Sequence, residues 1–154
     1  MFLQSDIREL DTKYGKRIDD ELKGAPVEFF LAAGKIFNTR MEEAATIVNE
    51  ILAKPFDFKV DETVTLDGDK LGYVSKQAEI KERWRKKLKY LTLERYADLL
   101  DTREKNKGKE GFVVKTDAEL EIEAREKTRK IIDRMFERFR FKFNDDDKFN
   151  VFVN

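Results

Sequence analysis

Apolar residues recur every three or four positions along most of this chain, a spacing typical of amphipathic helices. The longest such pattern covers residues 26–53 and predicts a helix that buries one face. Pro55 ends the pattern, because proline lacks an N–H donor and clashes with the preceding helical turn. The predicted inner stripe consists of Phe29/Phe30, Ala33, Phe37, Met41, Ala44/Ala45, Val48 and Ile51/Leu52.

A shorter helix is expected before this one. Ser5 is a good N-cap. Gly24 and Pro26 favour the end of one helix and the first turn of the next. Gly15 lies inside this expected helix and weakens it at that point. The apolar stripe of this segment consists of Ile7, Leu10, Tyr14, Ile18 and Leu22.

Residues 56–74 lack a helical period and predict an extended excursion or a short hairpin. Phe56 and Phe58 would lie on one side of an extended chain, with Asp57 on the other. The dipeptide Asp67-Gly68 favours a tight turn. The alternation around it is brief, so both forms stay open.

Two further helices are expected in the second half of the chain. Ser75 is predicted to cap the first, whose apolar phase shifts near Thr92 and indicates a kink or a break there. Residues 103–111 are polar, contain two glycines and predict a surface loop, and we assign no role to 103–116. Thr116 or Asp117 is predicted to cap the second helix. The two apolar faces consist of Ala78, Trp84, Leu88 and Leu91, then Leu93, Tyr96 and Leu100, and of Leu120, Ala124, Thr128, Ile131, Met135 and Phe139.

The acidic run 145–147 is predicted to open a short final helix that carries Phe149 and Phe152. The sequence therefore predicts an all-α fold. We expect an irregular bundle of about four to five helices, two of them long, with the excursion near 56–74.

Composition restricts the chemistry. The 154 residues are typical of one domain, and 32 basic residues balance 32 acidic ones, so no net charge attracts nucleic acid. Histidine and cysteine are absent and serine occurs only twice, which argues against an enzyme. We therefore predict no catalytic, cofactor-binding or metal-binding residue in this chain. No segment approaches the roughly 20 apolar residues of a membrane span. The first residues do not resemble a signal peptide, so the protein is either cytosolic or a piece without its export signal.

Four groups invite a catalytic, metal or nucleic-acid interpretation, and each has a simpler one. The Ser75-Lys76 pair would diverge on a helix, so Ser75 is read as a cap. The basic run 81–89 is read as a solvated face, since Trp84 and Leu88 are needed for the core. The Asp145–Asp147 run lacks the alternating calcium-loop pattern, and the Glu119–Glu123 pair lacks the histidines of a di-metal site.

Apolar residues at the Phe-rich end exceed one helical stripe, which indicates core packing or an interface. The candidate interface residues are Phe56, Phe58, Phe149 and Phe152.

The order of several motifs resembles the N-terminal helical domain of tail-specific proteases, the bacterial C-terminal processing peptidases. Residues 51–58, Ile-Leu-Ala-Lys-Pro-Phe-Asp-Phe, are similar to that family's Leu-x-x-Pro-x-Asp-Phe ending. The other segments that carry the resemblance are 3–7 with the helix that follows, 78–90 with Trp84, the Arg-rich aromatic helix 125–143, and 149–154, which looks like the beginning of the helix before the protease core. Loop 103–116 fits the family pattern poorly.

The resemblance implies a periplasmic serine protease with a Ser/Lys dyad and a PDZ domain that captures apolar C-terminal tails. Both would lie beyond residue 154, so no catalytic residue is carried over. Residues 1–154 are then expected to be a single accessory domain of a truncated chain. Its expected partners are the parent's PDZ and protease domains, and an adaptor or a substrate polypeptide, with no nucleic acid.

Two other interpretations stay open. One is a stand-alone helical interaction protein that dimerises through its Phe-rich end. The other is nucleic-acid binding through residues 81–89.

Overall fold

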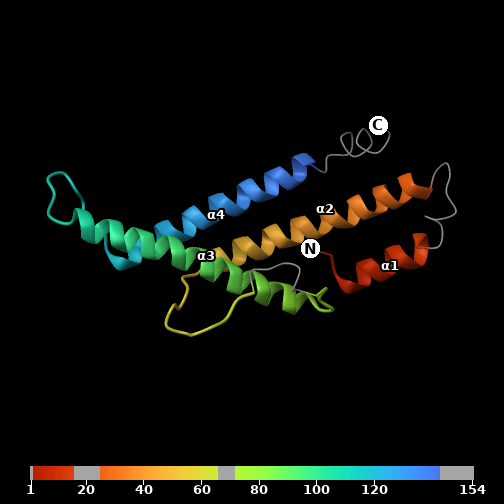
Figure 1. Ribbon diagram of the computed structural model, residues 1–154, viewed down its shortest axis with the longest axis horizontal. Coiled ribbons are helices and arrows are strands. Elements are labelled where there is room, and N and C mark those ends of the chain that lie inside the picture. The colour runs from red at the N-terminus through yellow and green to blue at the C-terminus, as the bar shows by residue number, and fades with distance from the viewer. Residues whose placement is uncertain (1, 16–24, 66–71, 143–154) are drawn as a thin grey trace.

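The computed structural model describes residues 2–15, 25–65 and 72–142, and within them it contains four helices and no strand (Figure 1). The all-α prediction is confirmed. No strand forms in the described parts of the 56–74 excursion, whereas its Asp67-Gly68 turn and the helix expected near Phe149 lie outside the described residues. The helices are α1 (Gln4–Tyr14), α2 (Ala25–Leu52), α3 (Gln77–Asn106) and α4 (Asp117–Lys142).

The helices α3 and α4 form an antiparallel pair, α2 packs against both, and α1 packs on α2 (Figure 1). Trp84 of α3 contacts Phe136 of α4 with ring centroids 5.9 Å apart. Burial of one apolar side chain contributes about 1.5–3 kcal/mol, so a small cluster can hold three helices together. The buried cluster consists of Met41, Ala44, Val48 and Leu52 of α2, Leu88 of α3, and Ile132 and Phe136 of α4.

Helix α1 begins two residues earlier than predicted, with Leu3 rather than Ser5 at the N-cap. The cause is Asp6, whose carboxylate accepts the Leu3 N–H at 2.8 Å. The same carboxylate is bound by the Arg40 guanidinium through two hydrogen bonds of 2.8 Å, so a contact with α2 sets the helix start. Helix α1 ends at Tyr14 with Gly15 as its C-cap, whereas the sequence placed Gly15 inside the helix. The predicted end at Gly24 and the stripe residues Ile18 and Leu22 lie outside the described residues.

Helix α3 also departs from prediction at its start and middle. Lys76, not Ser75, is its N-cap, and the Lys76 side chain makes no capping hydrogen bond. The helix runs through Thr92 without interruption, so the predicted break was wrong. Thr92 is fully buried on the inner row 84, 88, 92, 96, and a polar residue in that row makes the apolar phase appear to shift.

The hydroxyls of Thr92 and Thr128 join α3 to α4 inside the core. Thr92 Oγ1 donates to Thr128 Oγ1 at 3.1 Å, and Thr128 Oγ1 donates to the Ala124 carbonyl at 3.0 Å. Both threonines are 0% exposed. Because buried hydroxyls without a partner are costly, this chain of hydrogen bonds fixes how the two helices face each other.

The connection between α3 and α4 is shorter than expected, since α3 continues to Asn106 and residues 103–106 are helical. Gly108 and Gly111 adopt φ values of +87° and +78°, which L side chains rarely adopt. Thr116 caps α4 as predicted, because its Oγ1 accepts the Glu119 N–H and Glu119 accepts the Thr116 N–H.

Most of the predicted inner face of α4 is buried. The exception is Ile131, which is 36% exposed, whereas Ile132 is 1% exposed and takes its place in the core. Met135 and Phe139 pack at the edge of the cluster.

The threonine pair leads to an asymmetric prediction. Thr128→Val should lower the free energy of unfolding by about 1–2 kcal/mol, because the Thr92 hydroxyl loses its acceptor in the core. Thr92→Val should cost less, because Thr128 still donates to Ala124. Urea unfolding of both single variants and the double variant checks this. Equal and additive costs would contradict it.

The Asp6–Arg40 pair leads to a second prediction. Asp6→Asn should lower the free energy of unfolding by about 2–3 kcal/mol, since the buried charge that Arg40 binds is removed and one of the two acceptor oxygens becomes an NH2 donor. The Arg40 hydrogen bonds hold the pKa of Asp6 below its usual 3.8. This stabilisation is therefore present above about pH 3.8 and is lost as the pH falls through the lowered pKa. Urea unfolding between pH 2 and pH 7 measures it, with Glu9→Gln, which removes the exposed pair with Lys13, as a control of small effect.

Candidate functional site

The chain leaves α2 at a corner that α4 holds in place. Pro55 prevents the helix from continuing, and the Leu52 carbonyl accepts a hydrogen bond of 3.0 Å from Arg125 Nη1. Glu121, which pairs with Arg125 at 2.8 Å, accepts the Phe56 N–H at 3.3 Å. One ion pair on α4 thus binds both the end of α2 and the first residue after the proline.

The two phenylalanines of the corner lie on one side of the chain, as predicted. Their ring centroids are 6.1 Å apart, and Phe58 stacks on Tyr96 of α3 at 5.4 Å. Phe56 packs against the buried cluster. Asp57 points to solvent, where its Oδ1 accepts the Lys59 N–H at 3.0 Å. Both rings remain half-buried, so each keeps an accessible part.

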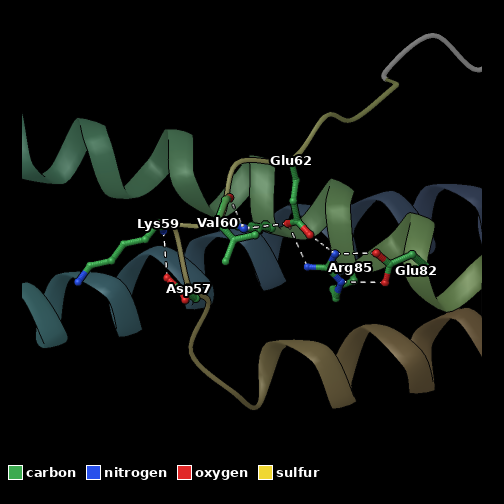
Figure 2. A network of polar contacts seen from close by, with 7 residues as sticks. Asp57, Lys59, Val60, Glu62, Glu82 and Arg85 are labelled. Carbon is green, nitrogen blue, oxygen red and sulfur yellow. Dashed lines mark hydrogen bonds and ion pairs between the residues drawn. The ribbon is translucent and has the colours of Figure 1, made fainter.

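Downstream of the corner, Glu62 is bound by two cations of α3. Figure 2 shows its carboxylate facing Arg85, with which it forms hydrogen bonds of 3.2 and 2.5 Å. Lys89 Nζ donates to Glu62 at 2.8 Å and to the Val60 carbonyl at 3.0 Å. The hydrogen bonds from Arg85, and then those from Lys89, lower the pKa of Glu62 from its usual 4.5 to about 2. Arg85 also binds Glu82, and these contacts raise the pKa of Arg85.

Lys89 was missed by the sequence reasoning, which assigned the run 81–89 to a solvated face. It is only 8% exposed, although other residues of the run follow the prediction. Its position directly after Leu88 was the available signal, because residues next to a buried position on a helix lie at the edge of the buried face. Lys81, Arg85 and Lys89 are each bound to a carboxylate, which leaves them less available to phosphates.

Two grooves adjoin this segment. The first has a volume of about 620 Å³ and lies between the end of α2, the corner and α3, with Ile51, Pro55, Phe56 and Val60 among its apolar lining. The second, of about 610 Å³, lies between α2, α3 and the chain after Glu62, where Ile47, Trp84 and Lys87 are part of its lining. The Lys87 ammonium sits 5.6 Å from the centre of the Trp84 ring. Both grooves combine apolar floors with charged rims, which suits polypeptide contacts.

The described residues do not assemble reactive groups. Ser75 and Lys76 are both exposed at the start of α3. Glu119 is engaged in the helix cap, and Glu123 is bound by Lys115 and Lys127, which lower its pKa. Within the described ranges, no cluster of three metal-ligating side chains occurs and no helix is long and apolar enough to cross a membrane. Phe149, Phe152 and Asp145–Asp147 lie outside those ranges, so their roles stay predictions.

The comparison with protein families gives one finding. The family model described as tail specific protease N-terminal domain matches residues 1–154. No curated protein and no solved structure matches the chain.

The Glu62 network leads to a pH-dependent prediction. Glu62→Gln should lower the melting temperature at pH 7, because Arg85 and Lys89 lose their shared carboxylate. The lowered pKa means that this stabilisation is complete above about pH 4.5 and disappears as the pH falls through about 2. Thermal unfolding across this range should show the variant and the wild type converging.

The matched control for this experiment is Glu50→Gln. It removes a single exposed ion pair with Lys81 on the neighbouring groove rim. Its effect at pH 7 should be much smaller, since exposed ion pairs contribute little. A Glu62→Gln deficit that persists unchanged at pH 2 would refute the role of the charge.

Proposed function

Because the chain belongs to the family of tail-specific protease N-terminal domains, we propose that it is the non-catalytic accessory domain of a periplasmic protease that acts on C-terminal tails. The catalytic Ser/Lys dyad and the PDZ domain of that protease are proposed to lie outside residues 1–154. The domain packs against them, shapes substrate access, or binds an adaptor protein.

The match over residues 1–154 is the observation that carries this proposal. The described side chains support it, since many of the charged ones are engaged in ion pairs and helix caps. An accessory domain needs contact surfaces, and the half-buried rings of Phe56 and Phe58 beside a groove of about 620 Å³ provide one. Phe56, Phe58, Phe149 and Phe152 remain the proposed interface residues.

The end of α4 provides a second surface. Phe141 is 77% exposed there, beside a shallow hollow lined by Arg134, Glu137 and Arg138. An exposed aromatic ring bordered by charged side chains is typical of a protein–protein contact. This position agrees with the expectation that the Phe-rich end of the chain faces another domain.

The test is a peptidase assay on a reporter protein that ends in an apolar tail. The 154-residue chain alone should give no cleavage, whereas the full-length parent should remove the reporter. Parent protein with alanine at its catalytic serine is the control for contaminating proteases. Clear cleavage of the reporter by the 154-residue chain itself would contradict the proposal.

A further inference from the structure

The connection between α3 and α4 exposes three consecutive apolar residues. It forms one end of the long axis of the molecule, away from α1 (Figure 1). Phe112 is 36% exposed, Val113 is 77% exposed and Val114 is 51% exposed. From Phe112 to Thr116 the chain runs without a turn or a bend. Aromatic and β-branched residues in such a segment are typical of a β-strand, not of a solvent-facing helix connection.

This segment is fixed at both ends. Arg103 of α3 donates to the Lys115 carbonyl at 3.1 Å and to Asp117 Oδ1 at 2.6 Å. The Phe112 N–H donates to the Lys109 carbonyl at 3.2 Å, which closes the turn on the other side. Hydrogen bonds at both ends therefore restrain the backbone that carries the apolar side chains. This restraint lowers the conformational entropy lost when a partner binds.

The backbone of the segment has unused hydrogen-bonding groups. Within the described part of the chain, the amides of Val113, Val114 and Lys115 donate no hydrogen bond. Exposed strands are often protected by an outward lysine. The Lys115 ammonium is instead bound to Glu123 of α4 at 2.7 Å, so its charge is directed back towards the helix.

We propose that residues 112–115 pair as a short β-strand with an open sheet edge in the protein of which this domain forms a part. This inference rests on the proposed function, according to which the chain is a domain of a larger protein. Contact with a purely apolar surface would bury the Val114 amide without an acceptor, at a cost in free energy. A sheet edge covers the apolar side chains and supplies carbonyl acceptors at the same time.

The contacts also indicate which residue faces the partner. The Lys115 carbonyl is bound by Arg103, so it faces α3. In an extended chain, neighbouring residues direct their backbone groups to opposite sides. Val113 then shares the side of Lys115, and Val114 directs its N–H and carbonyl away from α3 towards the partner strand.

Hydrogen exchange compares the 154-residue chain with the full-length parent. The Val114 amide should exchange at least 10-fold more slowly in the parent, while the Val113 amide changes less. Slow amides around Leu88 and Ile132 in both samples verify that the core is folded in each. Equal exchange of Val114 in both proteins would overturn the proposal. Protection in the isolated chain that rises with its concentration would overturn it too, because the partner would then be a second copy.

Variants of the parent test the hydrogen bond itself. Val114→Pro removes the outward N–H and should speed exchange at a contiguous run of amides outside residues 1–154, which identifies the partner strand. Val114→Thr keeps the N–H and the branched shape, and Val113→Pro removes an amide on the α3 side. Both should leave that run slow. The absence of such a run with Val114→Pro would overturn strand pairing.

The peptidase assay keeps the two proposals apart. Cleavage by the parent without protection of the Val114 amide would refute strand pairing and leave the proposed accessory function intact. Protection of Val114 in a parent that does not cleave tailed substrates would support the strand and remove the protease assignment.

Discussion

The hydrogen bond from Arg125 to the Leu52 carbonyl is the contact that decides how the chain leaves α2. Pro55 obliges α2 to stop and leaves carbonyls at its end without helical partners. A guanidinium satisfies one of them and complements the negative end of the helix dipole. Because Arg125 lies on α4 and its partner Glu121 binds the Phe56 N–H, the same pair directs the chain away from α2 and across α3.

A neutral, highly charged sequence can still encode specific tertiary contacts. Here 42% of the residues are charged, and several pairs connect segments that are distant along the chain. Asp6 with Arg40 joins α1 to α2, and Glu62 with Arg85 and Lys89 fixes the path after the corner. These pairs are partly shielded from water. Coulomb attraction is stronger in such a partly buried environment than at an open surface. The small apolar cluster holds the helices together, and the ion pairs decide how the connections lie on it.

The sequence was sufficient to predict which residues are buried where a single apolar stripe of a helix faces a single core. The α2 stripe through Met41, Ala44, Val48 and Leu52 is buried as its period predicts. Predictions failed where a contact distant in sequence decides the outcome. Ser5 was a reasonable cap, but Arg40 holds the Asp6 carboxylate where it caps Leu3. Two adjacent isoleucines on α4 are equally apolar, so only the position of α3 and α2 decides which of them is buried.

The candidate site was predictable to a similar extent. The proline and the two phenylalanines marked the corner, and their side-by-side placement followed from the alternation of an extended chain. The pairing of Glu62 with Arg85 and Lys89 was not visible, because these residues are more than twenty positions apart and nothing in their local pattern distinguishes them. The same holds for Thr92, whose burial depends on a hydroxyl partner on another helix.

The unbroken course of α3 has a mechanical consequence. The helix extends about 20 Å beyond Thr92, given a rise of 1.5 Å per residue. The connection between α3 and α4 is therefore held about 20 Å from the buried threonine contact by one continuous helix, so its position follows the direction in which α3 leaves the core.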